Sequence, residues 1–174
     1  MNEAMKNLLE RRSCRKYRDE QIRPEELDAI LKAGTYAPTG KGAQTPIMVA
    51  VQTPETLREV ERLNARVTGD ENAHTFYGAP TVIVVFGIRD NALSTADGNL
   101  VIGNLLNAAN AVGVDSCYIW RAAEAFDSEE GKALKQKWGV PEEYVGIGNV
   151  ILGYGFPEGI RTAAPRKEGY VIRA

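Results

Sequence analysis

The sequence predicts one domain of the α/β or α+β sandwich class, in which helices cover a largely buried sheet. The chain has 174 residues, a usual length for one domain and enough to bury a core without disulfides or metal ions. Amphipathic helical stretches alternate with four short apolar segments. One of these segments, residues 81–88, is an almost unbroken apolar run rich in Val and Ile, typical of a strand buried on both faces.

The first half of the chain begins with two predicted helices. Residues 2–11 carry apolar side chains at helical spacing. A second helix begins at Pro24 with an acidic first turn. The polar loop 37–46 then leads into a predicted strand at 47–51. These segments predict the order helix, helix, loop, strand.

The middle of the chain adds two helices around the buried strand at 81–88. A proline one residue after Thr53 predicts an N-cap and a helix behind it. Residues 64–77 are polar and rich in turn formers, and they receive no assignment. The pattern Ser94-Thr95-Ala96-Asp97 has the form of a capping box. The helix behind it runs to about Val112 and is apolar on most sides, which predicts a central buried helix.

The last third of the chain completes the pattern. A strand is expected at 114–120, a helix capped by Ser128 and ending near Trp138, and a fourth strand at 145–152. The tail from Gly153 is basic and has little regular pattern.

Composition excludes several classes of protein. Two cysteines and one histidine make neither a disulfide framework nor a four-ligand zinc site, and no metal site is expected. A Ser-His-Asp hydrolase would have to use His74, which is interpreted as a surface residue. The formal net charge of −2 argues against a nucleic-acid partner. No long apolar segment is present, so we expect a cytoplasmic protein without a membrane partner.

The most informative segment is a basic stretch between the first two helices. Arg11, Arg12, Arg15, Lys16 and Arg18 place five positive charges within eight residues of an acidic chain. Two interpretations stay open: a solvated surface, or an anion site in which arginine forks and the Ser13 hydroxyl bind phosphate oxygens. A second basic cluster, Arg166-Lys167, lies near the C-terminus. If the two clusters converge, they would surround one phosphate.

Two further features each have two interpretations, and a third has one. The loop 38–46 is either an ordinary connector or, with Thr39 and Gln44 beside flexible glycines, a contact for a flat ligand with polar edges. Cys14 is either a small unreactive residue or, beside arginines, a thiol of depressed pKa. Trp120, at the end of a strand, is interpreted as a core residue.

Several of these segments resemble the nitroreductase family of FMN flavoproteins. Chains of that family open with R-[RH]-S-x-[RK]-x-[FY] and continue with A-P-S-x-x-N-x-Q-P; here the corresponding segments are Arg11–Tyr17 and Ala37–Gln44. Further similarities are Tyr77–Pro80 before the buried strand, Asn104–Val114, Leu152–Tyr154 and Pro165–Lys167. Their order and spacing extend over essentially the whole chain.

The resemblance implies an α+β fold with a central, mostly antiparallel sheet flanked by helices, in one FMN-binding domain of residues 1–174. It also implies an intertwined homodimer with FMN at the interface. The implied contacts to the phosphate and the pyrimidine edge are Arg11, Arg12, Ser13 and Arg15, with Arg166 and Lys167 at the phosphate. The implied contacts from the partner subunit are Pro38, Thr39, Gly40 and Gln44. Asn72 would meet the ring edge, and Trp120 and Arg121 lie where the family places a backbone N–H against flavin N5.

The resemblance further implies an NAD(P)H oxidoreductase. NADH or NADPH would reduce FMN and leave, and a nitroaromatic, a quinone or a similar acceptor would take its place in a ping-pong reaction. No catalytic side chain is expected, because the flavin performs the hydride chemistry and the protein supplies position and charge. The alternative is a flavin-binding module without turnover, used for storage or for regulating a partner.

The chain departs from the family pattern in three places. Gly42 stands where the family often has Asn, and Thr45-Pro46 replaces a Pro-aromatic pair. Trp120-Arg121 is bulkier than the small or acidic residues common there. These departures concern the partner loop and the shape of the acceptor site, and they leave the phosphate contacts unchanged.

Overall fold

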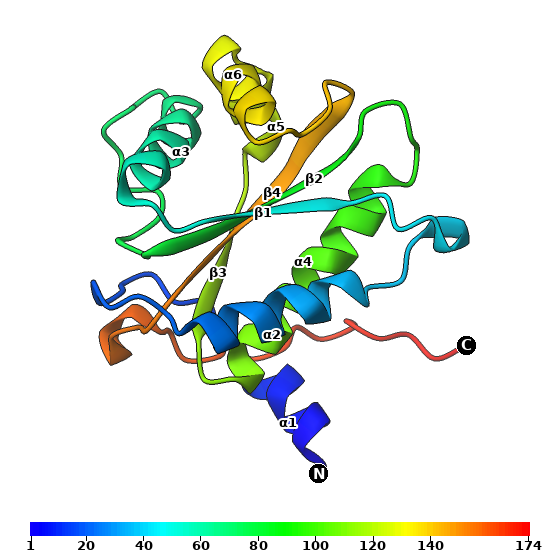
Figure 1. Cartoon of the computed structure of the whole chain (residues 1–174). Helices are drawn as coiled ribbons and strands as arrows, with labels where there is room; N and C mark the ends of the chain where they lie inside the picture. Colours follow the sequence, from blue (N-terminus) through cyan, green and yellow to red (C-terminus); the bar gives the residue numbers. More distant parts are fainter.

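The computed structural model describes residues 1–174 and contains one four-stranded sheet with helices on both faces (Figure 1). The strand order is β1-β2-β4-β3, and every neighbouring pair is antiparallel. The α+β class with a central antiparallel sheet is therefore confirmed. The strands are β1 (Ile47–Val51), β2 (Thr81–Ile88), β3 (Asp115–Ile119) and β4 (Tyr144–Gly153).

Six α-helices surround the sheet, and five of them match the predicted helices closely. The sixth, α5, was not predicted, because it is only six residues long and directly follows a residue with left-handed backbone. The helices are α1 (Glu3–Glu10), α2 (Pro24–Thr35), α3 (Pro54–Arg66), α4 (Ser94–Ala111), α5 (Ala122–Asp127) and α6 (Glu129–Lys137).

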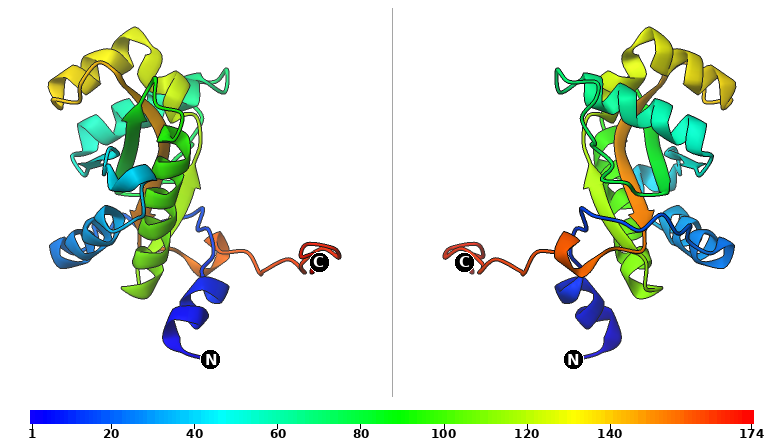
Figure 2. Two further views of the ribbon diagram at one scale, coloured as in Figure 1. Left: turned by 90° about the vertical axis from the view of Figure 1, so that its right-hand side faces the viewer. Right: turned by 90° about the vertical axis from the view of Figure 1, so that its left-hand side faces the viewer.

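Strand β2 separates two hydrophobic cores, as its unbroken apolar sequence predicted. Val82, Val84 and Phe86 pack with α3, α5 and α6, whereas Ile83 and Val85 pack with α2 and α4 on the other face. Figures 1 and 2 show these two helical layers on opposite sides of the sheet. The period-two alternation of side chains along a strand explains why one strand supplies both cores.

Helix α4 lies at the centre, as expected, and contacts α1, α2 and three strands. The predicted capping box at its start is wrong. Leu93 precedes the helix without a side-chain cap, and the Ser94 hydroxyl is buried without a partner. Asp97 Oδ1 instead accepts a hydrogen bond from the backbone N–H of Gly40, at 3.0 Å. Asp97 therefore anchors the loop 37–46 to α4.

The basic stretch and the segment after β4 lie side by side along one end of the sheet (Figure 1). The backbone N–H of Cys14 donates to Ser116 on β3, at 3.0 Å, and that of Arg15 donates to Gly159, at 2.9 Å. The N–H of Phe156 donates back to the carbonyl of Lys16, at 3.0 Å. These bonds bring residues from the two ends of the chain to the same place.

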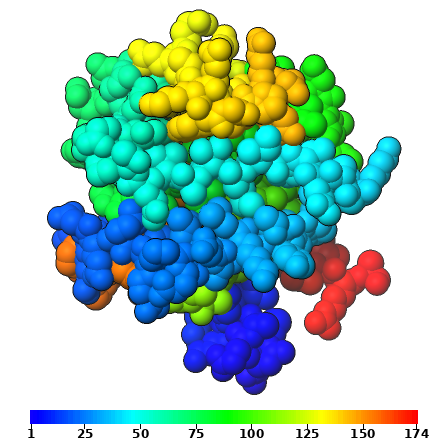
Figure 3. All heavy atoms as spheres, in the orientation of Figure 1, coloured from blue at the N-terminus to red at the C-terminus, as the bar shows by residue number.

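Helix α1 and the C-terminal tail project from the body (Figures 2 and 3). No residue of α1 is buried, and Met5, Leu8 and Leu9 are about half exposed. The last apolar residues of the tail, Val171 and Ile172, are also exposed. None of the helices combines the length and hydropathy that a bilayer crossing requires.

Candidate functional site

The basic stretch and the C-terminal tail together form an open hollow of about 500 Å³, here called the arginine hollow. Five arginines and no carboxylate line it. Residues 11–18 run beside residues 154–160 and are joined to them by backbone hydrogen bonds, so both segments lie on the same side of the sheet. The lining residues are Arg11, Arg12, Ser13, Arg15, Arg161, Thr162, Ala163, Ala164 and Arg166.

The charges of the arginine hollow are not neutralised within the chain. None of its five arginines forms a salt bridge. The Arg12 guanidinium is fixed by hydrogen bonds to the carbonyls of Leu9 and Arg11, at 2.8 and 2.7 Å. Arg11 Nη1 is buried without any partner. Since an unpaired buried donor is costly, this geometry favours an anion with several oxygens.

A second hollow of about 230 Å³ adjoins the first, and Arg15 lines both. We call it the aromatic hollow. The expectation that Trp120 belongs to the core is wrong, because Trp120 is 64% exposed. Strand β3 ends at Ile119, one residue earlier, and the chain then turns through a left-handed Arg121. The remaining lining residues are Thr75, Tyr77, Cys117, Tyr118, Ile119 and Arg121.

The aromatic hollow presents free hydrogen-bonding groups on a fixed backbone. The carbonyl of Trp120 accepts from Asn64 Nδ2, at 2.6 Å. The backbone N–H groups of Trp120 and Arg121 make no hydrogen bond within the chain. Thr75 Oγ1 is buried without a partner. Tyr77 and Arg121 both have positive φ, 54° and 77°, a strained conformation that proteins concentrate at binding sites.

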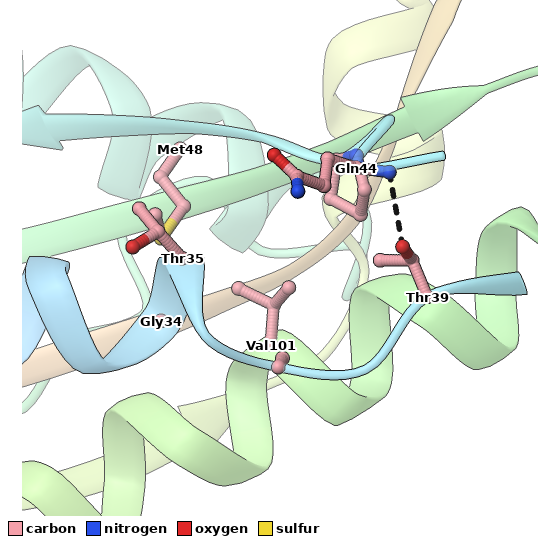
Figure 4. Close-up of a pocket in the computed structure, with 8 residues that line it drawn as sticks. Gly34, Thr35, Thr39, Gln44, Met48 and Val101 are labelled. Atoms are coloured by element: carbon pink, nitrogen blue, oxygen red, sulfur yellow. Dashed lines mark hydrogen bonds between the residues drawn. The ribbon is translucent and has the colours of Figure 1, made fainter. Parts of the chain in front are cut away.

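The loop 37–46 lies over a separate, smaller hollow of about 130 Å³ (Figure 4). Thr39 Oγ1 accepts a hydrogen bond from the backbone N–H of Gln44, at 2.9 Å, and both residues line the hollow. Lys41 and Gln44 have positive φ, 58° and 50°. A side chain on Gly40 would clash with Leu93 Cδ1, so glycine permits the close approach of the loop to the residue that precedes α4.

The structure brings together only part of the predicted set. Within one chain, Pro38, Thr39, Gly40 and Gln44 line neither the arginine nor the aromatic hollow. Asn72 is exposed in the turn after α3 and lines neither hollow. Lys167 lies outside the lining, with Nζ over the ring of Tyr170 at 5.7 Å from its centroid.

The interpretation of Cys14 as a reactive thiol is wrong. Its side chain is fully buried. Burial raises the pKa of the thiol, so the group stays protonated and unreactive near neutral pH. His74 is exposed, as expected of a surface residue.

Several lining residues were missed in the sequence. Arg161 was visible only as one of the basic residues of the tail, and nothing in its neighbourhood indicated a site. Thr75 lies in the turn-rich segment that received no assignment, and Tyr118 has the pattern of an ordinary strand residue. Their shared position depends on contacts between distant parts of the chain.

The chain belongs to the nitroreductase family. A protein of Archaeoglobus fulgidus with the provisional name NADH dehydrogenase/NAD(P)H nitroreductase is 32% identical over 165 residues, covering 88% of this chain and 86% of the relative. The model of the Nitroreductase family matches residues 8–73, which include the basic stretch and the loop 37–46.

Solved structures of the same fold extend over the whole chain. A nitroreductase with bound FMN from Bacteroides fragilis is 28% identical, covers 100% of both chains and superposes with a TM-score of 0.92. A nitroreductase with bound FMN from Desulfitobacterium hafniense is 26% identical, covers 100% of this chain and 99% of its own, and has a TM-score of 0.88.

Proposed function

We propose that this chain binds FMN in a single domain and is an NAD(P)H-dependent oxidoreductase of the nitroreductase family. The observation that carries the proposal is the convergence of five arginines, none of them in a salt bridge, on one hollow beside the aromatic hollow. The FMN in two similar structures and the names of the relatives support it. An "FMN reductase [NAD(P)H]" of Bacillus subtilis is also 36% identical over 63 residues, 36% of this chain.

The residues present fit FMN in both charge and shape. Arg11 Nη1 is buried without a hydrogen-bond partner. The negatively charged oxygens of a phosphate would accept its hydrogen bond. A flavin ring is flat and has polar edges, which matches the free backbone N–H groups beside Trp120 and the unpartnered Thr75 hydroxyl. Arg15, which lines both hollows, would stand between the phosphate and the ring.

Each predicted site residue takes a role in this proposal. Arg11, Arg12, Ser13 and Arg166 would hold the phosphate, and Arg161 joins them because it lines the same hollow. The backbone at Trp120 and Arg121 would face the flavin N5 edge. Asn72 and Lys167 stay predictions of a ring contact and a phosphate contact, since neither lines a hollow within the single chain.

We also infer a homodimer whose second copy completes the site. The loop residues Pro38, Thr39, Gly40 and Gln44 line neither the arginine nor the aromatic hollow of their own chain, and we assign their contact with FMN to the partner subunit. Helix α1 buries none of its leucines within the chain. A partner that covers α1 and the apolar end of the tail would remove this exposed apolar surface from water.

The chain's residues would position and charge the site, while FMN supplies the two-electron chemistry. A nicotinamide and an acceptor would use the same open face in turn. For a nitro compound the balance is NAD(P)H and one proton plus the nitro group, giving NAD(P)⁺, the nitroso compound and one water. Positive charge from Arg15 would stabilise the negative charge that accompanies reduction.

Anaerobic titration of the FMN-reconstituted protein tests the function. We expect a yellow protein whose absorbance near the flavin maximum bleaches on addition of NADH or NADPH and returns when a nitroaromatic or quinone is added. A yellow protein that neither nucleotide bleaches would favour the flavin-binding module without turnover. A protein that binds no FMN would refute both.

A further inference from the structure

Arg121 carries a charge that the proposed cofactor contacts leave unused. Arg121 lines the aromatic hollow, and its side chain forms neither a salt bridge nor a hydrogen bond within the chain. Only its backbone is assigned to the flavin edge. No carboxylate lines the aromatic hollow, and Arg15 adds a second positive charge. The hollow therefore has an electrostatic preference for anions.

The fold fixes the position from which the Arg121 side chain extends. The residue has φ 77°, and the next residue, Ala122, is fully buried at the start of α5. The carbonyl of Arg121 accepts from the N–H of Ala125, at 3.1 Å, and the carbonyl of Trp120 accepts from Asn64. A left-handed backbone costs an arginine conformational energy, so the position is held by its surroundings rather than by local preference.

Three aromatic residues beside Arg121 are exposed. Trp120 is 64% exposed, and Tyr77 and Tyr118 are each more than a third exposed. All three line the same hollow as Arg121. Aromatic faces bind flat apolar rings, while an unpaired guanidinium binds a carboxylate or sulfonate, often with two parallel hydrogen bonds. With the flavin ring in the aromatic hollow, an acceptor on the open face of the flavin would lie beside these side chains, and Arg121 matches a negative substituent on its ring.

We propose that the acceptor reduced by this protein is an aromatic compound with an anionic substituent, and that Arg121 pairs with that substituent. The inference rests on the proposed function and names its substrate class. A nitro group on such a ring takes up two electrons and two protons to give a nitroso group and one water. The carboxylate stays intact and serves only for binding.

A pair of similar acceptors tests the charge preference. Reduced, FMN-loaded protein is mixed anaerobically with 4-nitrobenzoate or with its neutral counterpart 4-nitrobenzamide, and flavin reoxidation is followed by stopped flow. The readout is the ratio of the two second-order rate constants, because the ratio cancels effects of a variant on the flavin itself. The variants are Arg121→Asn, which suits a left-handed backbone, and Arg121→Lys, which keeps the charge. Arg58→Gln on α3, an exposed arginine that lines neither hollow, is the matched control.

We expect Arg121→Asn to lower the ratio of anionic to neutral acceptor about tenfold, the effect of one charge-assisted hydrogen bond. Arg121→Lys should retain most of the ratio, and Arg58→Gln should leave it unchanged. In the unmodified protein, raising NaCl from about 20 to 500 mM should lower the ratio, since salt screens the attraction. This second measurement needs no variant to fold.

An unchanged ratio in Arg121→Asn, or a wild-type ratio that ignores salt, would overturn the inference. An unchanged ratio together with slower reduction by NAD(P)H would assign Arg121 to the phosphates of the dinucleotide instead, which also overturns it. If neither compound reoxidises the wild-type protein and no quinone does so, the proposed function fails. That result is distinguishable from failure of the charge preference, in which both compounds react.

Discussion

The arginine hollow and the loop 37–46 differ in how the fold holds them. The hollow is built on backbone hydrogen bonds between the basic stretch, β3 and the segment after β4. The loop is attached through side chains of two other elements: Asp97 of α4 accepts from the N–H of Gly40, and the Tyr144 hydroxyl of β4 donates to the carbonyl of Thr45. The hollow gathers its charged side chains within one chain, whereas Gln44 of the loop is exposed on a left-handed backbone.

The difference indicates which half of the site a single chain can complete. A phosphate needs several donors, and a single chain brings five arginines to the hollow. The loop has positive φ angles at Lys41 and Gln44 and exposes polar groups, but it lines neither the arginine nor the aromatic hollow of its own chain. This arrangement is expected of a segment that contacts the ligand of a second copy. The predictions below separate these two halves.

Loss of the dimer is the largest effect we expect. The unmodified protein should have twice the 19.0 kDa chain mass in light scattering at micromolar concentration. Leu8→Glu combined with Leu9→Glu on α1 should yield monomers, because burial of each leucine contributes about 1.5–3 kcal/mol and about 1.4 kcal/mol changes the constant tenfold. Glu55→Gln on the exposed face of α3 is the control. A monomeric unmodified protein would remove the shared site from the account.

Removal of one phosphate contact tests the other half of the site, the arginine hollow. Arg11→Ala should weaken FMN binding about tenfold or more, since a hydrogen bond to a charged group contributes about 1.5–3 kcal/mol. Titration of flavin fluorescence measures the dissociation constant. Arg18→Ala is the matched control, because Arg18 belongs to the same basic stretch but lies over the ring of Phe156, outside the hollow. Equal affinities for Arg11→Ala and the unmodified protein would contradict the assignment.

The elements of the fold could be predicted largely from local pattern. The apolar run of β2 and the spacing of apolar residues in α4 reflect burial, and buried residues can be recognised from their apolar side chains in the sequence. The capping box failed for a physical reason: Asp97 satisfied the local pattern, but a backbone N–H 57 residues earlier in the chain is its partner. A rule based on neighbouring residues cannot predict a hydrogen-bond partner that is distant in the sequence.

The candidate site was only partly predictable. Arg11 and Arg166 were visible as separate clusters, but their approach depends on backbone bonds such as the one between Arg15 and Gly159. The sequence predicts a core position for Trp120, because the residue is apolar and ends a strand. The left-handed turn at Arg121 places it at the surface instead, and neither propensity nor periodicity predicts that turn.

Loosening the loop should have a smaller effect. Asp97→Ala removes the acceptor for the Gly40 N–H, and we expect trypsin to cleave after Lys41 about threefold faster, for a net loss of about 0.5–1.5 kcal/mol. Asp97→Asn keeps an oxygen at the same position and should restore the slow rate. Equal cleavage in all three proteins would mean that the loop is not held through α4.

The smallest effect is expected for His74, the only imidazole. His74→Ala should keep the rate of flavin reduction by NAD(P)H within about tenfold, whereas loss of a general acid or base costs about 10²–10⁴-fold. Stopped-flow bleaching measures this step apart from acceptor turnover. A thousandfold loss with FMN fully bound would make His74 catalytic and the cofactor-only mechanism wrong.

The most direct test of the arginine hollow compares FMN with riboflavin, which has the same ring and lacks the phosphate. Both are titrated into cofactor-free protein while flavin fluorescence is followed. Because several charge-assisted hydrogen bonds would be made to the phosphate, we predict that the affinity for FMN is at least about a hundredfold higher than the affinity for riboflavin. Equal affinities for the two flavins would contradict the assignment of Arg11, Arg12, Arg15 and Arg166 to the phosphate.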